Sequence, residues 1–408
     1  MDPRNLTVKD FSYHLPEEKI AAFPLMERDQ SKLLVYRNNT ISEDVYSNIA
    51  DHLPENAMLV FNNTRVVEAR IMFQKPTGGI IEIFALEPHE QYPDITTAMQ
   101  SKGLVRWKCL IGGAGKWKHG QVMKKQAFEN GVSISLQARI VERSADSFTI
   151  EFSWEPVQLT FSEILHFLGM IPIPPYLKRE TVLSDHERYQ TIYAQSEGSV
   201  ASPTAGLHFT ANIFHSLIIK NIQSNFITLH VGAGTFMPVK SKTISGHNMH
   251  AEWMQVERTF IQKLSDHQQD IFAVGTTSLR TLESLYWMGV KCYSNPYIDN
   301  KNIEIKQWEV YEELKEKSIP VKTAIKALLI WMDQNKIQVL TVKTSILIAP
   351  PYRPQLVRGL ITNFHQPNST LLLLVAALIG NEWTKVYDYA LHNHFRFLSY
   401  GDGCLLYV

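Results

Sequence analysis

Short apolar runs that end abruptly in polar loops recur three times in the second half of the chain. These runs are Phe226–Val231, Asp270–Gly275 and Gly359–His365. Runs of this length predict buried strands, and apolar residues at helical spacing after them, as in Leu371–Ile379, predict helices. Because strands that alternate with helices form mostly parallel sheets, the pattern predicts an α/β domain.

Each predicted strand is followed by glycine or hydroxyl residues. The loops are Gly232-Ala-Gly-Thr235, Thr276-Thr-Ser278 and Gln366–Thr370. Hydroxyl side chains at helix starts can cap free N–H groups, and such helix ends attract anions. Ligands of parallel sheets bind beyond the carboxyl ends of the strands, so we expect the three loops to converge on one site.

A further polar segment, Gly198–Thr210, precedes the first of these strands. It contains Ser202, Thr204 and His208 and has little apolar content, which predicts a surface loop. Its last residue, Thr210, stands where an N-cap is expected, directly before apolar residues at helical spacing.

Between about Val66 and Trp154 the pattern changes to short strand-like runs separated by glycine turns. Such spacing predicts a small β-barrel or sandwich inserted into the α/β chain. We therefore expect an α/β domain at residues 1–65 and 155–408, with an elaboration at about 290–345, and an inserted domain at residues 66–154.

One window of the insert, Ile95–Phe128, contains seven Lys or Arg residues and no Asp or Glu. Trp107 and Trp117 lie between these cations. A solvated basic face and a surface that binds single-stranded nucleic acid both fit this composition.

Composition narrows the class of protein. The 408-residue chain is long enough for two or more domains, and its formal net charge of zero provides no global field toward nucleic acid or membrane. Cys109, Cys292 and Cys404 are odd in number and far apart, which argues for a reducing compartment. Without the apolar core of a signal peptide near the first residue, the sequence predicts a cytoplasmic protein.

Two local motifs suggest other chemistry. His247 and His250 are three residues apart near Glu252, but no third ligand is obvious, so we expect no metal. The loop Val231–Phe236 resembles the first loop of a Rossmann methyltransferase, although Phe236 replaces the third glycine. An S-adenosylmethionine-dependent RNA methyltransferase and a non-catalytic RNA-binding protein therefore remain alternatives.

Motifs spread over nearly the whole chain resemble the S-adenosylmethionine:tRNA ribosyltransferase-isomerase family of queuosine biosynthesis. The matching stretches are Leu33–Val35, Leu59–Arg65, Pro172–Arg179, Arg188–Ala194, Gly198–Thr210, Thr228–Phe236, His247–Glu252, Gly275–Glu283, Thr362–Leu371 and Arg396–Asp402. The resemblance implies a three-layer α/β domain with an inserted small β-barrel domain.

The resemblance also implies a reaction. The ribosyl group of S-adenosylmethionine moves to 7-aminomethyl-7-deazaguanine at the tRNA wobble position and rearranges to epoxyqueuosine, with release of adenine and methionine. S-adenosylmethionine is consumed as a substrate, and no cofactor is implied. We expect a monomer that acts on tRNA and has no membrane contact.

The resemblance and the motif loops together give candidate residues. A base must remove a proton from the carbon beside the sulfonium, and His208, His230 and His365 fit by type and place. Thr276, Thr277 and Ser278 suit the methionine carboxylate, and Arg280 and Asp402 suit polar groups of the nucleoside. The other substrate-binding candidates are Arg65, Thr204, Gly232, Gly234, Thr235, Asn363, Ser369, Thr370 and Tyr400. The candidate tRNA contacts are Lys116, Trp117, Lys118, Lys178, Arg179 and Arg188.

The chain departs from the family pattern in two places. Family members usually carry an Asp four residues before the Thr-Asn-Phe-His motif, and Arg358 stands there instead. Residues 290–345 are also longer than usual. If either segment touches the substrate, the accepted base or tRNA would change.

Overall fold

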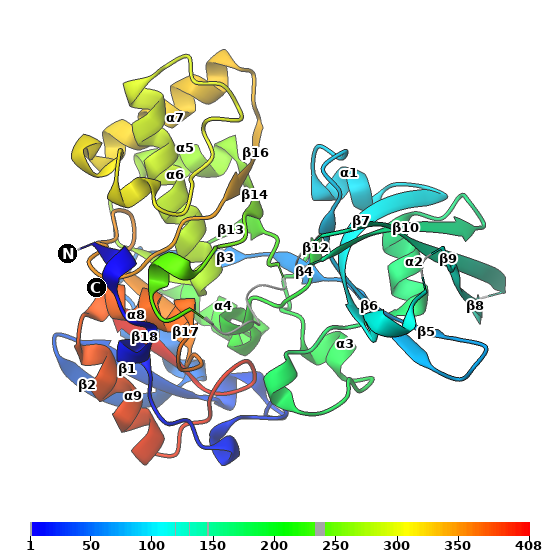
Figure 1. Cartoon of the computed structure of the whole chain (residues 1–408). Coiled ribbons are helices and arrows are strands. Elements are labelled where there is room, and N and C mark those ends of the chain that lie inside the picture. The colour runs from blue at the N-terminus through cyan, green and yellow to red at the C-terminus, as the bar shows by residue number, and fades with distance from the viewer. Residues whose placement is uncertain (1, 119, 130, 145–146, 233–240) are drawn as a thin grey trace.

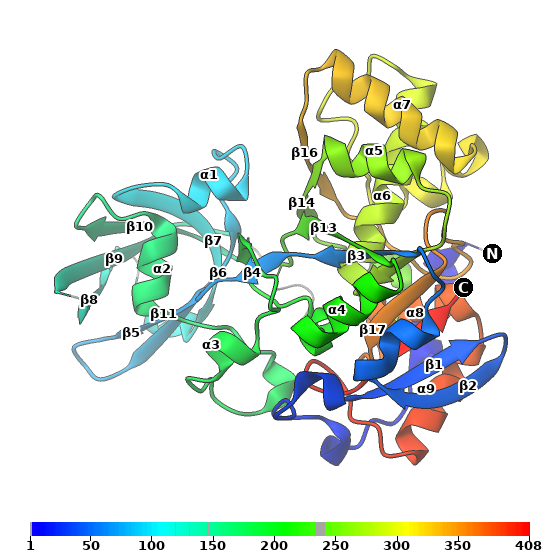
Figure 2. The same cartoon turned by 180° about the vertical axis from the view of Figure 1, so that it is seen from behind.

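The computed structural model describes residues 2–118, 120–129, 131–144, 147–232 and 241–408 (Figure 1). A large α/β body lies beside a smaller β-rich insert, and the chain passes between them at β4 (Thr64–Val66) and β12 (Ser196–Ser199). These two short strands pair in parallel, and Figure 2 shows the same junction from behind.

The body is built on a nine-stranded sheet of order β16-β14-β13-β3-β15-β17-β18-β1-β2. The strands are β1 (Lys32–Arg37), β2 (Thr40–Val45), β3 (Met58–Asn62), β13 (Gln223–Leu229), β14 (Glu252–Glu257), β15 (Ile271–Val274), β16 (Val339–Thr344), β17 (Gly359–Asn363) and β18 (Gly403–Tyr407). The central strands β13, β3, β15 and β17 run parallel, so their carboxyl ends share one edge of the sheet. The three predicted strands are confirmed as β13, β15 and β17.

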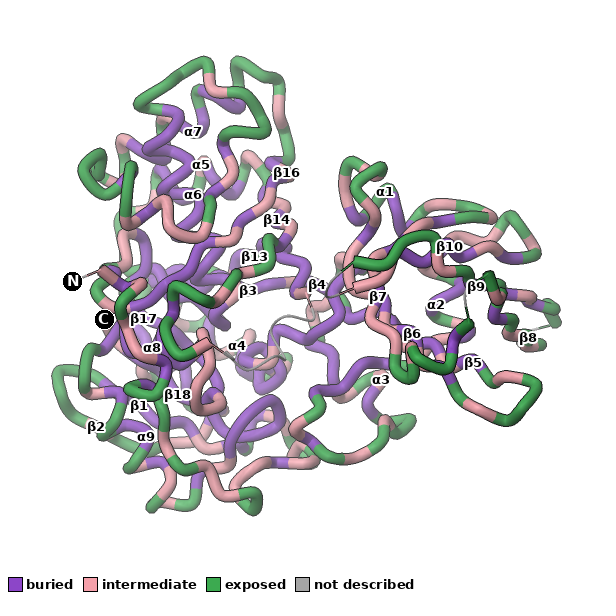
Figure 3. Tube along the Cα trace, viewed as in Figure 1, coloured by how far each residue is buried: buried purple, intermediate pink, exposed green. Residues whose placement is uncertain are grey.

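Helices cover both faces of this sheet because successive strand residues point to opposite sides. In β1, Leu33 and Val35 join the core on one face, whereas Leu34 and Tyr36 join the core on the other. The first face carries α4 (Ala211–Ile219), and the second carries α5 (Arg258–Asp266), α6 (Thr276–Ser294), α7 (Val321–Gln334), α8 (Thr370–Ile379) and α9 (Glu382–His392). Figure 3 shows the buried central strands enclosed between more exposed outer elements.

The predicted helix starts are confirmed. Thr210 caps α4 by accepting a hydrogen bond from Ile213 N at 3.4 Å, and Ser369 caps α8 by accepting one from Leu372 N at 3.2 Å. Helix α6 begins differently, because its N-cap Gly275 has a φ of 91° and no side chain to cap the first turn. Within the described residues, no helix has both the length and the apolar character needed to cross a membrane.

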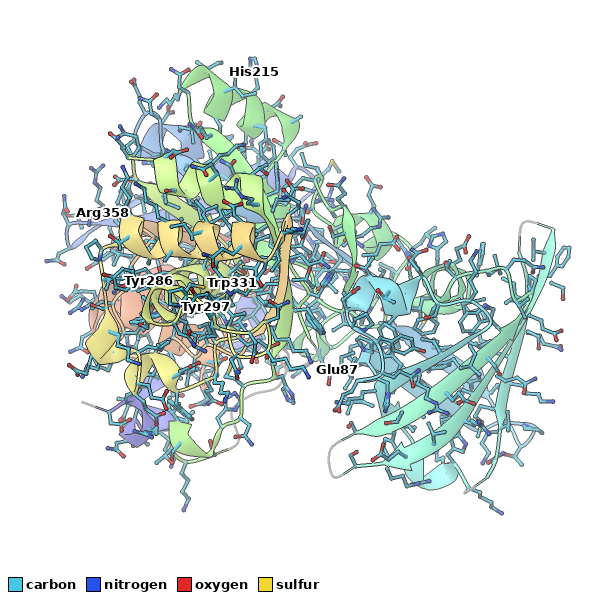
Figure 4. All side chains as sticks on the ribbon, turned by 90° about the horizontal axis from the view of Figure 1, so that it is seen from above. Glu87, His215, Tyr286, Tyr297, Trp331 and Arg358 are labelled. Atoms are coloured by element: carbon cyan, nitrogen blue, oxygen red, sulfur yellow. The ribbon has the colours of Figure 1, made fainter. Side chains whose placement is uncertain are left out.

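The elaboration at residues 290–345 extends the body. Strand β16 pairs with β14 at the sheet edge, and α7 lies against α5 and α6. Trp331 of α7 is buried and donates from Nε1 to Ile298 O at 2.8 Å, while Tyr286 of α6 donates to Ile319 O at 2.9 Å. Figure 4 labels Tyr286, Trp331 and the exposed Tyr297.

The insert is a seven-stranded antiparallel sheet of order β11-β5-β6-β7-β10-β9-β8. Its elements are β5 (Arg70–Gln74), β6 (Ile80–Pro88), α1 (Ile95–Met99), β7 (Leu104–Gly112), β8 (Met123–Glu129), β9 (Val132–Arg143), β10 (Phe148–Glu155), α2 (Phe161–Leu168) and β11 (Gly169–Met170). Lys125 of β8 reaches Met72 O of β5 at 3.1 Å, but the pairing of the described strands leaves β8 and β11 as edges, so a closed barrel is not confirmed. The sheet continues past the expected boundary at residue 154 because α2 packs Phe161 against Trp107 and β11 pairs with β5.

Asn62, the last residue of β3, joins three chain segments through one fully buried amide. Its Nδ2 donates to Leu229 O at 2.9 Å and its Oδ1 accepts from Leu229 N at 3.0 Å, so the amide pairs with the end of β13 as a backbone peptide would. Oδ1 also accepts from Thr64 N at 3.2 Å, and Nδ2 lies 3.4 Å from Thr277 Oγ1. This amide therefore fixes the exits of β3 and β13 relative to the start of α6.

We expect Asn62→Asp to lower the free energy of unfolding by about 1–3 kcal/mol, because an oxygen would replace the donor facing Leu229 O and leave that buried carbonyl unpaired. Urea unfolding measures the loss. The neighbouring Asn63→Asp is a matched control, since among the described residues the Asn63 side chain uses only its oxygen, which accepts from Thr228 Oγ1 at 2.7 Å. Equal losses in the two variants would contradict the role assigned to Nδ2.

Candidate functional site

The carboxyl ends of the central strands open into a recess, here called the central cavity, that encloses about 790 Å³ with its open mouth included. It is lined by Tyr176, Tyr189, residues 201–205, Val231, residues 275–277, residues 362–366, Ser369, Leu371, Leu398 and Ser399. The loops that follow β15 and β17 meet here with the Gly198–Thr210 segment. Gly234 and Thr235 of the loop after β13 lie outside the described residues.

No Asp, Glu, Lys or Arg is among the described residues that line the central cavity. The polar groups that it offers are hydroxyls, amides and one imidazole. The first turn of α6 also faces it through Thr276 and Thr277, and Gly275 leaves the N–H groups of that turn without a side-chain cap. The cavity therefore suits neutral polar groups along its walls and one anionic group at the start of α6.

Of the three candidate histidines, His365 lines the central cavity. Its Nε2 shares a hydrogen bond with Thr362 Oγ1 at 2.9 Å, and its backbone is held by Tyr387 OH at 3.0 Å and Tyr13 OH at 2.5 Å. Burial lowers the pKa of His365 to about 3. The imidazole is therefore neutral at physiological pH and can accept a proton without first losing one.

His208 is buried behind the cavity wall, stacked on the Tyr46 ring at 4.2 Å. Its Nδ1 lies 3.4 Å from Arg28 O, and its Nε2 lies 3.3 Å from Asn363 Nδ2. Because a carbonyl can only accept, Nδ1 carries the proton and Nε2 accepts from Asn363, whose Oδ1 in turn accepts from Thr204 Oγ1 at 2.8 Å. Burial lowers the pKa of His208 to about 4. His208 thus orients Asn363 and Thr204, which line the cavity.

His230 lies away from the described lining of the cavity. Its Nδ1 is 3.3 Å from Thr64 Oγ1, and its Nε2 has no hydrogen-bond partner among the described residues. Burial lowers the pKa of His230 to about 4. The structure therefore does not bring His230 together with His365 at one reacting atom.

The expectation of a surface loop at Gly198–Thr210 is wrong, because most of this segment is buried. Part of its bonding capacity is satisfied internally: Ser199 Oγ donates to Ala201 O at 2.7 Å and accepts from Val231 N at 3.0 Å. Apolar members such as Phe209 join the core beneath the sheet. A hydroxyl-rich segment can be buried when most of its polar groups have partners.

A second recess adjoins the central cavity at Leu371. It is lined by Gly232, residues 247–250, Glu252, Arg280, residues 346–348, Thr370, Leu371 and Leu374. Arg280 is buried in an ion pair with Glu252, which also accepts from Gly232 N at 3.2 Å. The expected residues Gly232, Arg280 and Thr370 therefore gather beside the central cavity. No cluster of three potential metal ligands occurs among the described residues.

Several expected substrate-binding residues instead hold the loops in place. Ser278 Oγ, in the first turn of α6, donates to Val274 O at the end of β15 at 2.8 Å. Asp402 accepts from Lys32 N at 3.0 Å and from Arg396 N at 2.7 Å, and both bonds are internal. Arg65 has an exposed side chain on β4, at the junction between body and insert.

A buried carboxylate organises α3 (Asp185–Arg188) near the cavity mouth. Asp185 accepts from Arg179 Nη1 and Nη2 at 2.7 and 2.8 Å and from Tyr400 OH at 2.8 Å. Burial alone would raise the pKa of Asp185, but the hydrogen bonds from Arg179, Val182 N and Tyr400 lower it below its ordinary value. Arg179 and Tyr400 therefore have a structural role, and their expected contacts with tRNA and with the nucleoside stay predictions.

The neighbouring cations differ in exposure. Lys178 is exposed and pairs with Glu17, whereas Arg188 donates to Met26 O at 3.1 Å and to Leu25 O. Arg188 thus ties α3 to the N-terminal segment, and Lys178 lies at the surface.

Trp117 is not available for stacking on a base, which corrects its assignment as a tRNA contact. The side chain is 2% exposed, packs in the core of the insert and donates from Nε1 to Gln121 O at 2.8 Å. Its neighbours Lys116 and Lys118 are exposed. Two cations of the same window, Arg106 and Lys108, are paired with carboxylates from outside it.

Arg358 lies at the amino end of β17, whereas the central cavity lies beyond its carboxyl end. Its Nη1 donates to Val408 O at 2.9 Å, and its backbone N donates to Ile271 O at 2.7 Å (Figure 4). The replacement of the usual Asp by Arg therefore leaves the lining of the cavity unaltered.

Tyr176, Tyr189, Ser202 and Ser399 are among the lining residues that the sequence did not assign to the site. Each lies inside a motif stretch, so motif membership could have identified it. Tyrosine and serine occur in many structural roles, however, so the residue type alone does not predict a role in the site. Their convergence depends on contacts between distant parts of the chain, such as the 2.5 Å hydrogen bond between Tyr176 OH and Ser399 Oγ.

Comparison with known proteins gives consistent matches. Residues 8–406 match the family model described as queuosine biosynthesis protein. Proteins named S-adenosylmethionine:tRNA ribosyltransferase-isomerase from Carboxydothermus hydrogenoformans and Rickettsia bellii are 34% and 35% identical over 407 residues, covering 98% of this chain and 100% and 99% of theirs. The protein of the same name from Magnetococcus marinus is 33% identical over 401 residues, covering 97% of this chain and 93% of its own. A solved structure of S-adenosylmethionine tRNA ribosyltransferase from Thermotoga maritima aligns with a TM-score of 0.45 at 25% identity, over 97% of this chain and 99% of that one.

The buried histidines make stability depend on pH. Their folded-state pKa values are about 4 for His208 and His230 and about 3 for His365. The unfolded chain protonates histidine near pH 6.5, so below that pH the unfolded state binds more protons and is favoured. We expect the free energy of unfolding to fall as the pH decreases from about 6.5 toward 4.

Urea unfolding at several pH values measures this loss. His208→Gln should flatten the dependence, because it removes one buried titrating group. His215→Gln should leave it unchanged, since His215 is exposed on α4 (Figure 4). A wild-type stability that is constant across this range would contradict the neutral, buried state of the three imidazoles.

Proposed function

The chain belongs to the queuosine biosynthesis protein family, and on that basis we propose that it is an S-adenosylmethionine:tRNA ribosyltransferase-isomerase. It transfers and isomerises the ribosyl group of S-adenosylmethionine onto 7-aminomethyl-7-deazaguanine at the wobble position of tRNA. The products are epoxyqueuosine-tRNA, adenine and methionine. The match over residues 8–406, with relatives of the same length and name, is the observation that carries this proposal.

S-adenosylmethionine occupies the central cavity in this proposal. The methionine carboxylate lies at the first turn of α6, near Thr276 and Thr277, because the uncapped N–H groups of a 19-residue helix attract an anion. The uncharged walls take the ribose and the base through neutral hydrogen bonds. No metal or redox cofactor enters the reaction, since the sulfonium itself provides both the acidity and the leaving group.

His365 is the proposed base. Its imidazole lines the cavity, where it can take the proton from the carbon beside the sulfonium. The hydrogen bond to Thr362 fixes the ring orientation. His208 acts as a positioning residue, because it holds Asn363 from behind the cavity wall.

In this proposal the insert binds the tRNA. Its described strands form one seven-stranded antiparallel sheet beside the body, at the junction that carries Arg65. The exposed Lys116 and Lys118 contact phosphates of the anticodon arm. Arg65 contacts the part of the tRNA strand that enters the cavity. The protein acts on tRNA as a cytoplasmic monomer.

The decisive experiment is incubation with S-adenosylmethionine and tRNA that carries the aminomethyl-deazaguanine, followed by mass spectrometry. We expect release of adenine and methionine and a ribosyl mass gained by the tRNA. Formation of S-adenosylhomocysteine and a methylated RNA would favour a methyltransferase instead. Binding of tRNA without turnover would favour a non-catalytic RNA-binding protein.

We expect His365→Asn to lower kcat by at least about a hundredfold, the usual scale for a general base. His215→Asn, on the exposed face of α4, should leave kcat unchanged. Because the pKa of His365 is about 3, kcat/KM should show no acid limb from this group between about pH 5 and 7. Near-normal turnover of a folded His365→Asn variant would place the base elsewhere.

Replacement of Lys116 and Lys118 by Gln should flatten the slope of log affinity for tRNA against log salt by about one to two units, because fewer counterions are released. The control is replacement of Lys322 and Lys326 by Gln, which removes the same charge from the exposed side of α7. A salt titration of tRNA binding measures all three proteins. Parallel lines for wild type and the Lys116/Lys118 variant would mean that these lysines form only a solvated face.

A further inference from the structure

Two hydroxyl groups in the wall of the central cavity have no hydrogen-bond partner among the described residues. They are Ser202 Oγ and Tyr189 OH, which lies near Ser399 and the Ser202 backbone without a well-formed hydrogen bond to either. Tyr189 is 0% exposed and Ser202 is 7% exposed, so water does not readily satisfy either group. An unpaired buried hydroxyl costs free energy, and such groups call for a partner that the free protein lacks. A ligand in the cavity would supply that partner.

Tyr176 and Ser399 complete the same side of the cavity, where their hydroxyls are 2.5 Å apart. We call Tyr176, Tyr189, Ser202 and Ser399 the hydroxyl wall. Its members come from the turn at Pro175–Leu177, the end of α3, the loop after β12 and the loop before β18. Burial raises the pKa of Tyr176 to about 12 and that of Tyr189 further, so these phenols stay neutral.

The hydroxyl wall is rigidly supported. Tyr189 is the C-cap residue of α3, and Asp185 fixes that helix by accepting hydrogen bonds from Arg179 and Tyr400. The Tyr400 ring also meets the Tyr189 ring edge-on at 5.8 Å. The position of Tyr189 OH is therefore set before any ligand arrives, which lowers the entropy lost on binding.

The chemistry of the hydroxyl wall selects among the parts of a ligand. A phosphate would favour cations, and a sulfonium would favour a carboxylate, yet no described lining residue carries a formal charge at neutral pH. Neutral hydroxyls both donate and accept hydrogen bonds. The edge of a purine-type base presents donors and acceptors side by side, and such hydroxyls can pair with either.

We propose that the hydroxyl wall recognises the hydrogen-bonding edge of a purine-type base, with Tyr189 and Ser202 as the residues that determine specificity. This inference rests on the proposed function, which brings two such bases to the site. One is the adenine of S-adenosylmethionine, and the other is the 7-deazaguanine of the tRNA. Their edges place donor and acceptor in opposite order, amino donor beside N1 acceptor in adenine and O6 acceptor beside N1–H donor in the deazaguanine, and a hydroxyl can pair with either.

The test uses Tyr189→Phe and Ser202→Ala, each of which removes one hydroxyl that has no internal partner. The thermal stability of the ligand-free protein should therefore be unchanged or slightly raised, whereas affinity for the recognised ligand should fall about tenfold or more. Tyr193→Phe is the matched control. Its hydroxyl is also buried and unpaired among the described residues, but its ring packs against Phe61 at 5.2 Å and is outside the described cavity lining.

Calorimetric titration of each protein with S-adenosylmethionine, and separately with tRNA that carries the aminomethyl-deazaguanine, distinguishes the two bases. If a variant loses affinity for S-adenosylmethionine only, the result supports recognition of adenine. If it loses affinity for tRNA only, the result supports recognition of the deazaguanine. An S-adenosylmethionine analogue with purine in place of adenine extends the first arm: Tyr189→Phe or Ser202→Ala should lose part of the wild-type preference for the natural base.

Unchanged affinity of both variants for both ligands, with wild type binding normally, would overturn the role of the hydroxyl wall and leave the proposed reaction intact. An equal loss in Tyr193→Phe would also overturn it, because the effect would then not depend on the cavity. Failure of wild type to bind either ligand would overturn the proposed function and the inference together. Release of adenine by wild type in the turnover assay separates these outcomes.

Discussion

The amide of Asn62 is the interaction on which the arrangement of the cavity depends. Parallel strands end at one edge of a sheet, but their exits must diverge if a ligand is to enter between them. The Asn62 side chain pairs with Leu229 at the end of β13 and also reaches Thr64 and Thr277. It thereby holds the exits of two strands and the start of α6 together without a further strand. Because the amide is fully buried, any substitution that loses its donor or acceptor leaves a polar group unpaired.

Burial also determines which groups near the cavity carry a net charge. The charged groups nearby are neutralised in pairs, Arg280 with Glu252 and Arg179 with Asp185, and they lie outside the described lining of the central cavity. Burial also keeps His365 neutral by lowering its pKa to about 3. In the proposed reaction the cationic sulfonium thus enters a site without competing fixed charge, and its own positive charge acidifies the adjacent carbon. A protonated imidazole at this place would instead repel the substrate.

The local parts of the fold could be predicted from the sequence, whereas the burial of individual polar residues could not. Strand and helix periodicity and the caps at Thr210 and Ser369 depend on neighbouring residues, and all of these were confirmed. The surface position expected for Gly198–Thr210 was wrong because the segment makes contacts that exist only in the folded state: Ser199 Oγ accepts from the distant Val231 N, and Phe209 joins the core. Trp117 was misplaced for the same reason, since a tryptophan between lysines is equally consistent with a solvated face and with a core anchor.

Motif membership also overstates how many residues can touch the substrate. Asp402, Tyr400 and Arg179 belong to motif stretches, yet each forms hydrogen bonds with other residues of the protein. These bonds fix loops at the cavity edge. Tyr189 and Ser202 belong to motifs as well, and they retain unpaired hydroxyls at the cavity. Unsatisfied bonding capacity at the cavity surface is therefore the more discriminating criterion, because a group whose bonds are already made has little left to offer a ligand. By that criterion the specificity of this site lies in neutral hydroxyls, and the charged motif residues keep those hydroxyls in position.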